Sequence, residues 1–489
     1  MTLMFAPAVM PRLPRSTPEA QGLNSSAVHS FLDTVVRDGQ EMHSVMILRR
    51  GAVITEGWWS PYAPEHPHML YSLSKSFTAT AAGLAVAEGK FSLEDTVVSF
   101  FPDDVPTEIS ANLAAMRVRD LLTMSSGHNE EPPIRHNPTE NWARAFLAHP
   151  VTHEPGTHFV YSSSATYMVS VIVQKTTGQD LLEYLGPRLF APLGMGSPTW
   201  ERCPRGIPVG GWGLNVRTED IAVFGELYRN GGVWNGERIL PEGWVATATE
   251  KHVSNGSDPN NDWNQGYGFQ FWRCRHGAYR GDGAFGQYCV VLPEQEAVVA
   301  ITSRVNDMGA VLNGIWDVLL PAMGAAPLAE DSTAHTALSE RLSHLSIPPQ
   351  DGERSAETAV KVSGTTYRFA PNEMEIASAV LNFAGNGGGG KLALSDGERD
   401  YEIPFGYGEW ANGATGFPAF GPAFQSLSAS GAWTDDDTFT LKICFYETPF
   451  IPTITCRFAD DMVTMEIYGS MGFGPKERPA LIGSRDADK

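Results

Sequence analysis

Two stretches of alternating apolar runs and turn residues have the pattern of β-hairpins. The first spans His43–Trp59, where β-branched and aliphatic residues flank Arg50–Gly51. The second spans Gln287–Ser303, with Pro293–Glu296 between its two apolar runs. Short apolar runs bounded by turn residues are typical of strands. We therefore predict strands near both ends of the first 320 residues, and one more in the aromatic run 266–274.

Helical patterns lie between these predicted strands. Ser72–Glu88 is rich in alanine and ends at Gly89, and Met308–Leu320 is a further apolar helix. Thr218 is placed to cap a third helix whose first turn is acidic, which suits the positive end of the helix dipole. Asn230–Gly232 ends that helix. The pattern predicts an α+β fold, in which an antiparallel sheet is flanked by helices and a helical subdomain is inserted.

The composition changes after Leu320. Pro, Ala and Ser dominate the following segment, which includes a short polar helix and ends near Pro348–Pro349. Beyond it, strand-like runs recur with turn residues between them, at 358–364, 438–446 and 462–469. We predict a large first domain, a linker and a C-terminal all-β barrel. The predicted bounds are 1–325, 326–355 and 356–489.

Charge and cysteine content exclude several classes of partner. The formal net charge is −21 and no basic run occurs, so neither nucleic acid nor an anionic membrane is an expected partner. No stretch is long enough to span a bilayer, and the first twenty residues make a poor export signal. Five cysteines without CxxC spacing fit reduced thiols. We predict a cytoplasmic protein, and the sequence leaves open whether it forms a homo-oligomer.

The chemistry is concentrated in Tyr71-Ser72-Leu73-Ser74-Lys75, which holds the only S-x-x-K of the chain. Residues three apart on a helix share a face, so the Lys75 amine can reach the Ser72 hydroxyl. A serine hydroxyl is a weak nucleophile without such a base, and burial lowers the pKa of an amine. The start of the helix also offers backbone N–H groups to a developing oxyanion. By itself, however, the motif is common in exposed helices.

Three further phrases give the motif its context. They are Pro155-Gly156-Thr157-His158-Phe159-Val160-Tyr161-Ser162-Ser163, the run Gly281-Asp282-Gly283-Ala284 before a strand, and LLTMSSGH at 121–128. With Ser72 and Lys75, they resemble the serine β-lactamase and penicillin-binding-protein superfamily. The class C-like branch of esterases, D-aminopeptidases and 6-aminohexanoate-dimer hydrolases is the most similar, over about residues 18–320. The resemblance implies a β-lactamase/transpeptidase-like first domain and a lipocalin-like barrel.

The resemblance also implies roles for individual residues. Ser72 forms the acyl-enzyme, Lys75 is its partner, and Tyr161 is a general base whose phenolate the Lys75 charge favours. The oxyanion hole consists of the N–H groups of Ser72 and Ala284, beside Asp282 and Gly283 on the strand that borders the cleft. Trp212 either lines the acyl pocket or is an ordinary packed tryptophan. The reaction needs no metal and no organic cofactor.

Two positions depart from the family pattern. Ser163 stands where the family has Asn, and Gly281 stands where it has Lys or His. The missing base faces a substrate carboxylate in the family, so the sequence predicts a preference for neutral or amine-bearing small-molecule esters, amides or peptide-like compounds. The alternatives are a β-lactamase, a D-aminopeptidase or DD-peptidase, a slowly deacylating penicillin-binding sensor, and an inert scaffold whose barrel does the binding.

Two other motifs have a simpler interpretation. Gly385–Lys391 matches G-x-G-x-x-G, but Leu392 follows where a P-loop needs Ser or Thr, and no helix opens on the glycines. We predict a hairpin turn there. Asp435–Asp437 is most simply a solvated turn and not a calcium loop.

Overall fold

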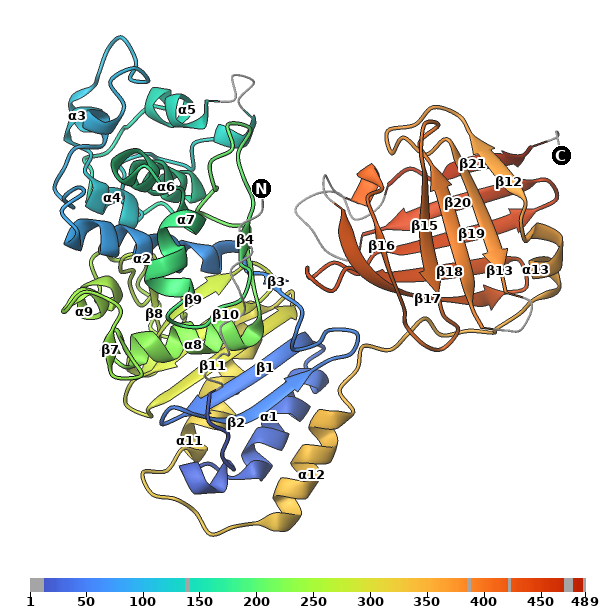
Figure 1. The fold of residues 1–489 in the computed structure, drawn as a ribbon, viewed down its shortest axis with the longest axis horizontal. Helices are drawn as coiled ribbons and strands as arrows, with labels where there is room; N and C mark the ends of the chain where they lie inside the picture. The colour runs from blue at the N-terminus through green and yellow to red at the C-terminus, as the bar shows by residue number, and fades with distance from the viewer. Residues whose placement is uncertain (1–12, 137–140, 385–387, 421–423, 470–477, 487–489) are drawn as a thin grey trace. The chain divides into compact units, whose positions relative to one another are not determined.

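The computed structural model describes residues 13–136, 141–384, 388–420, 424–469 and 478–486, which belong to two structural units (Figure 1). The first unit runs through Trp58 and from Pro67 to His344. The second unit consists of Trp59–His66 and the chain from Leu345 onward. The boundary at His344 lies inside the segment that the sequence predicts as a linker.

The first unit is built on a six-stranded antiparallel sheet with the strand order β2-β1-β11-β10-β9-β8. Its strands are β1 (Glu41–Arg49), β2 (Ala52–Trp58), β8 (Trp272–Arg273), β9 (Tyr279–Gly283), β10 (Gln287–Leu292) and β11 (Ala297–Arg304). Both predicted hairpins are confirmed. Arg50 and Gly51 have φ angles of 50° and 79°, which the tight turn between β1 and β2 requires. The predicted strand over 266–274 is much shorter than expected.

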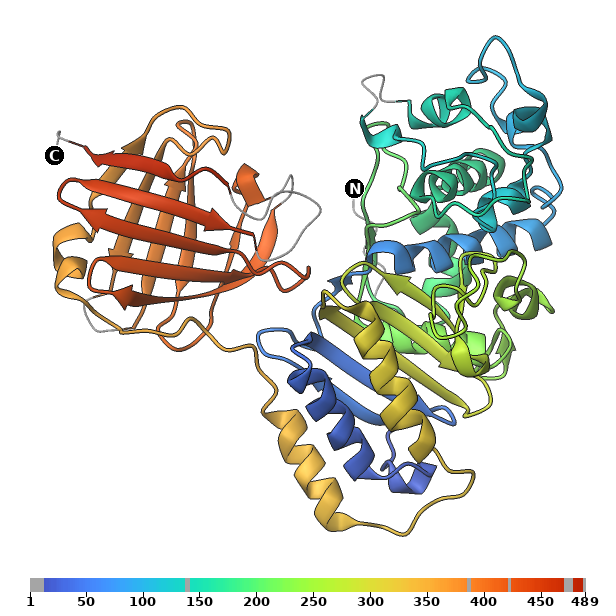
Figure 2. The ribbon, with the colours of Figure 1, turned by 180° about the vertical axis from the view of Figure 1, so that it is seen from behind.

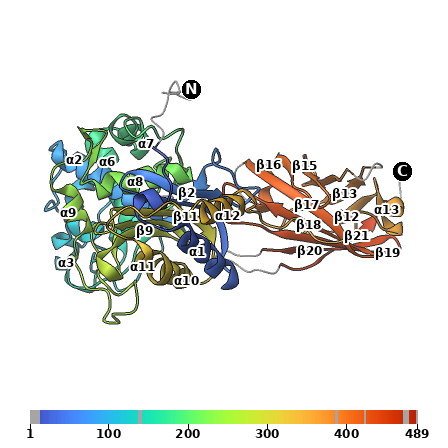
Figure 3. The ribbon, with the colours of Figure 1, turned by 90° about the horizontal axis from the view of Figure 1, so that it is seen from below.

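Helices cover both faces of this sheet (Figures 2 and 3). One face carries α8 (Thr218–Arg229), and the other carries α1 (Ser25–Arg37), α10 (Met308–Gly314) and η7 (Ile315–Leu319). Arg217, and not the predicted Thr218, is the N-cap residue of α8. The side chain of Asp220 accepts from the backbone N–H of Arg217, so the N–H of the N-cap residue is satisfied.

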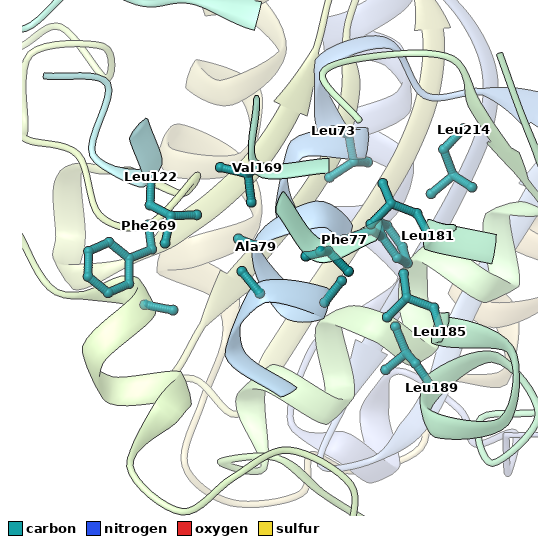
Figure 4. Close-up of a cluster of buried hydrophobic side chains, with 14 of the residues drawn as sticks. Leu73, Phe77, Ala79, Leu122, Val169, Leu181, Leu185, Leu189, Leu214 and Phe269 are labelled. Carbon is teal, nitrogen blue, oxygen red and sulfur yellow. The ribbon is translucent and has the colours of Figure 1, made fainter. Parts of the chain in front are cut away.

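A helical subdomain is inserted between the strands. Its central helix, α2 (Ser74–Ala87), is buried on nearly all sides, which requires apolar or hydrogen-bonded residues around its whole circumference. Figure 4 shows Phe77 and Ala79 of α2 among Leu181, Leu185 and Val169 from neighbouring helices. The remaining helices of the unit are α3 (Ala111–Ala115), α4 (Val118–Leu122), α5 (Trp142–Ala148), α6 (Ser163–Thr177), α7 (Leu181–Leu185), α9 (Trp244–Thr249), α11 (Leu320–Ala322) and α12 (Ser332–Ser343).

Short elements complete the first unit. The short helical turns are η1 (Glu19–Gln21), η2 (Tyr71–Leu73), η3 (Val97–Phe100), η4 (Ile134–His136), η5 (Gly186–Phe190) and η6 (Arg275–Gly277). One small sheet consists of β3 (His68–Met69), β4 (Thr199–Trp200) and β5 (Leu214–Val216). A second consists of β6 (Val233–Trp234) and β7 (Glu237–Arg238). The turn η2 directly precedes α2 and carries Ser72, so the fold places this residue at the start of a buried helix.

The second unit is a ten-stranded antiparallel barrel that is nearly closed. Next to its open edge, the backbone of Gly406 makes two hydrogen bonds to β17. Its carbonyl accepts from the N–H of Gly431 at 2.9 Å, and its N–H donates to the carbonyl of Ala429 at 3.2 Å. The predicted barrel is confirmed, and its likeness to lipocalins stays a prediction. The elements are β12 (Thr366–Phe369), β13 (Ser378–Phe383), β14 (Gly390–Ser395), β15 (Asp400–Phe405), β16 (Ala411–Thr415), η8 (Pro418–Phe420), β17 (Gln425–Asp435), β18 (Thr438–Cys444), β19 (Thr453–Ala459), β20 (Met462–Tyr468) and β21 (Leu481–Arg485).

One strand prediction in this unit is wrong. Residues 358–364 lie mostly in the helix α13 (Glu357–Val362). The predicted solvated turn at Asp435–Asp437 is confirmed, because Asp435 ends β17, Asp436 and Asp437 form the turn to β18, and all three are exposed. The glycine run 385–391 lies partly outside the described residues, and β14 begins at its Gly390 as a strand and not a helix.

A segment of the N-terminal half belongs to the barrel unit. The backbone N–H of Ser60 donates to Leu345 at 3.0 Å, and that of Ile347 donates to Ser60 at 2.8 Å. The Tyr62 hydroxyl donates to the carbonyl of Thr448 at 2.9 Å. The chain therefore passes into the second unit once between β2 and β3, and again after His344.

Candidate active site

The predicted nucleophile and its base lie next to each other at the start of α2. The Lys75 amine donates to the Ser72 hydroxyl at 2.9 Å, to the Ser163 hydroxyl at 3.0 Å and to the carbonyl of Gly211 at 2.6 Å. These acceptors come from η2, from the first residue of α6 and from the loop before β5. The amine is thus fixed from three directions, with Ser72 as one of its partners.

The environment of Lys75 changes its acidity. The side chain is only 1% exposed, and all three of its acceptors are uncharged. Burial therefore lowers the pKa of Lys75 to about 7, against the raising effect of the Glu131 carboxylate. At neutral pH a large fraction of this amine carries no proton, so it can accept one from Ser72.

Tyr161 lies beside the same two residues, just before α6. The Lys75 amine is 4.9 Å from the centroid of its ring, a cation–π distance, and the ring stacks on Trp272 at 5.1 Å. Burial, followed by the charge of Asp282, raises the pKa of the Tyr161 phenol far above its usual range, although a hydrogen bond with Ser72 opposes this. Burial therefore favours the protonated phenol, and the role of Tyr161 as a general base stays a prediction.

Two glycines bring strand β9 directly against η2. A Cβ atom on Gly283 would lie 2.0 Å from the carbonyl oxygen of Leu70 and 3.1 Å from the nitrogen of Ser72. A Cβ atom on Gly281 would lie 2.4 Å from the Leu73 side chain. A Cβ atom at position 281 would therefore require the Leu73 and Ser76 side chains to move, and as it stands this position carries no cation.

The backbone is strained on both sides of the predicted oxyanion hole. Tyr71, before Ser72, has a φ of 48°, and Phe285, after Ala284, has a φ of 67°. Their rings meet edge to face at 5.2 Å. The N–H of Ala284 donates to no backbone carbonyl in the described part of the chain. Strain of this kind persists only where packing maintains it, and it gathers at functional sites.

Asp282 forms a buried ion pair. Its carboxylate accepts from the guanidinium of Arg280 at 2.9 Å, and the two side chains are 6% and 0% exposed. Arg280 also donates to the carbonyl of Asp262 at 3.0 Å. The structure thus places Asp282, predicted to bind substrate, in a buried ion pair with Arg280.

Ser163 and Trp212 both adjoin the Lys75 site. Ser163 takes the place of the family's Asn and accepts from Lys75, as described above. Trp212 follows Gly211 and is 7% exposed. The guanidinium carbon of Arg135 lies 3.4 Å from the centroid of its ring, so Trp212 is packed on one side by a cation.

Sequence reasoning misses three groups near this site. They are the carbonyl of Gly211, the carboxylate of Glu131 and the guanidinium of Arg135. The carbonyl is invisible to any search by side chain. Glu131 and Arg135 belong to the segment after LLTMSSGH, in which no motif distinguishes them from other surface charges.

Metal sites, membrane-spanning helices and disulfide bonds are all absent from the described residues. Among them, no three His, Cys, Asp or Glu side chains are grouped so that they could hold a metal ion. No helix in the described ranges has the length and apolarity to cross a membrane. All five cysteines are buried and free of disulfide bonds.

Comparisons with known proteins agree on the first unit. The sequence profile of the family described as Beta-lactamase matches residues 32–319. The 6-aminohexanoate-dimer hydrolase of Paenarthrobacter ureafaciens is 25% identical over 285 residues, which cover 54% of this chain and 72% of the relative.

Two solved structures share the fold. The one described as "Putative 6-aminohexanoate-dimer hydrolase from Bacillus anthracis" is 21% identical with a TM-score of 0.53, and the match covers 65% of this chain and 89% of the other. The octameric penicillin-binding protein homologue from Pyrococcus abyssi is 17% identical with a TM-score of 0.50, and the match covers 94% and 99% of the two chains. The second match extends over both units.

Proposed function

The chain belongs to the beta-lactamase family, and from this premise we propose that it is a serine hydrolase that cleaves a carboxylic ester or amide through an acyl-enzyme on Ser72. The observation that carries the proposal is the 2.9 Å hydrogen bond from the buried Lys75 amine to the Ser72 hydroxyl. A base with a pKa near the working pH combines availability with driving force for proton transfer.

Acylation begins with the uncharged form of Lys75. The amine accepts the Ser72 proton while Oγ attacks the carbonyl carbon of the substrate. The N–H groups of Ser72 and Ala284 stabilise the oxyanion. The phenol of Tyr161 then donates its proton to the leaving oxygen or nitrogen, and the Lys75 ammonium returns a proton to the phenolate. The serine proton has in effect moved to the leaving group.

Deacylation repeats these steps with water. Lys75 accepts a proton from the water that attacks the ester carbonyl, and the same oxyanion hole holds the second tetrahedral intermediate. The Ser72 oxygen leaves and takes the proton from Lys75. The carboxylic acid product departs, and both side chains return to their starting forms.

The charges around the site favour a neutral or amine-bearing substrate over a carboxylate. Position 281 offers no cation, and the ion pair of Asp282 with Arg280 is closed to solvent. Arg135, an exposed cation near the site, is stacked on Trp212 and is acted on by the charges of Glu201 and Glu131. A neutral ester tested beside nitrocefin measures this preference, and a higher kcat/KM for nitrocefin would contradict it.

Labelling with a fluorophosphonate tests the nucleophile. We expect one covalent adduct per chain, located on the peptide that contains Ser72, and no adduct in Ser72→Ala. The matched control is Ser74→Ala, two residues away, whose hydroxyl accepts from the backbone N–H of Leu214 and is not one of the three acceptors of Lys75. Labelling of Ser72→Ala at the wild-type rate would refute the proposal.

A further inference from the structure

Glu131 lies 32 residues before Ser163 in the sequence, yet its carboxylate meets the start of α6. One oxygen, Oε1, accepts from the backbone N–H groups of Ser163 at 2.8 Å and of Ser164 at 3.1 Å. The same oxygen accepts from the Ser164 hydroxyl at 3.3 Å. A side chain on an otherwise exposed loop is thus bound at three points to the element that carries Ser163.

These contacts complete the cap of a 15-residue helix. Ser162 is the N-cap residue, and its hydroxyl accepts from the backbone N–H of Ala165 at 3.1 Å. Glu131 supplies the acceptors for the two N–H groups that precede Ala165. The first N–H groups of a helix lack partners within the helix, and its positive end favours an anion. The carboxylate therefore fixes the position of the first turn of α6.

The first turn of α6 in turn holds the amine of Lys75. The Ser163 hydroxyl accepts from this amine at 3.0 Å, so Glu131, Ser163, Lys75 and Ser72 form a continuous chain of contacts. Displacement of Ser163 would remove one of the three acceptors that fix Lys75 beside the nucleophile. The other two acceptors, on Ser72 and Gly211, lie on the opposite elements η2 and the loop before β5.

Glu131 carries a negative charge, whereas the groups that hydrogen-bond to Lys75 carry none. The direct acceptors of the amine are uncharged. The charged groups around it are Glu131 and Arg135 from the loop and η4, and Asp282 from β9, while Tyr161 presents its ring. Asp282 is already paired with Arg280. Among the described residues, Glu131 makes no ion pair of its own, so its negative charge acts on the amine without direct contact.

We propose that Glu131 is a positioning residue for the acyl transfer described above: it fixes Ser163 against Lys75 and places a negative charge near the buried amine without touching it. The kinetic consequences of this inference rest on the proposed function. The contacts of Glu131 with Ser163 and Ser164 do not depend on that function. Burial lowers the pKa of Lys75, and the Glu131 carboxylate opposes that effect. Removal of this charge must therefore make Lys75 lose its proton at lower pH.

The test compares Glu131→Gln with Glu130→Gln. Both variants remove one carboxylate, but that of Glu130 is exposed and lies 3.9 Å from the His149 ring nitrogen Nε2. For Glu131→Gln, we expect the acid limb of kcat/KM for a neutral ester to move to lower pH by on the order of one unit. For Glu130→Gln, we expect the wild-type profile. Glu131→Ala should show the same movement and a kcat about tenfold lower, because alanine offers no acceptor to α6.

A purely structural role would lower kcat without moving the acid limb, and that result in Glu131→Gln would overturn the proposal. A second readout does not need turnover. In protein labelled with ¹³C-lysine, the Cε signal of Lys75, assigned with Lys75→Arg, should titrate at lower pH in Glu131→Gln than in Glu130→Gln. If wild type hydrolyses every ester tested no faster than Ser72→Ala, the proposed function fails. The titration of Lys75 still decides whether Glu131 acts on the amine.

Discussion

Replacement of Gly283 by alanine is expected to reduce activity far more than stability. At Gly283, strand β9 packs directly against the backbone segment that carries Ser72. An added Cβ atom would lie 2.0 Å from the carbonyl oxygen of Leu70, whereas Cβ atoms essentially never come closer than 3.0 Å to such an atom. Backbone and not a flexible side chain is the obstacle, so the two segments must separate.

The size of the effect follows from that separation. Ser72 and Ala284, which supply the proposed oxyanion hole, lie on opposite sides of this contact. A misplacement of about 1 Å in a catalytic group costs about 10²-fold in rate, so we expect kcat/KM to fall by roughly that factor. Overpacking of a buried position costs about 1–3 kcal/mol of unfolding free energy, which a chain with a core of this extent can tolerate.

The assay measures ester hydrolysis and fluorophosphonate labelling together with urea unfolding. Gly186→Ala is the matched control, because a Cβ atom there meets nothing within 4 Å and its φ is not positive. It should keep both wild-type activity and wild-type stability. If Gly283→Ala hydrolyses esters at the wild-type rate while it remains folded, β9 does not position the oxyanion hole and the reasoning fails.

Two further predictions concern buried titratable groups. Lys75→Met should be inactive but more stable than wild type at pH 6, by at most about 5 kcal/mol, less the cost of the acceptors left unpaired. The folded chain holds the Lys75 proton only up to pH about 7 and the unfolded chain up to about 10.5, so urea unfolding should show the difference shrinking as the pH rises between these values. His43 is buried and bonds to His68 at 3.0 Å, and burial lowers the pKa of His43 to about 4. Its unfolded form binds a proton first, so stability should fall from pH 6.5 to about 4, with a smaller slope in His43→Gln.

Local patterns predict the elements and the central pair of the site well, because they depend on neighbours in sequence. The hairpin around Arg50–Gly51 follows from turn chemistry and strand runs alone. The contact between Ser72 and Lys75 follows from their spacing at the start of a helix. Tyr161 could be placed only through the family resemblance, since about ninety residues separate it from Ser72.

Other features depend on neighbours that the local sequence does not contain. The pKa of Tyr161 is set by burial among aromatic side chains from distant segments, and a sequence shows the charge of Lys75 but not that burial. Residues 357–362 form a helix although their valines favour strands, because the buried positions Ala359 and Val362 recur three residues apart. The segment Trp59–His66 joins the barrel unit through bonds to residues nearly three hundred positions away.

The indirect placement of Glu131 explains how one lysine can be both fixed and able to lose its proton. A carboxylate in direct contact with Lys75 would stabilise the ammonium and raise its pKa well above neutrality. An amine with no anion nearby would lose its proton too readily to return one to Tyr161 or to Ser72. Three uncharged acceptors fix the position of the Lys75 amine. Glu131 contacts Ser163 and not Lys75, and its charge adjusts the proton affinity of the amine. A base that must accept and return a proton in each half of the reaction needs a pKa between those extremes.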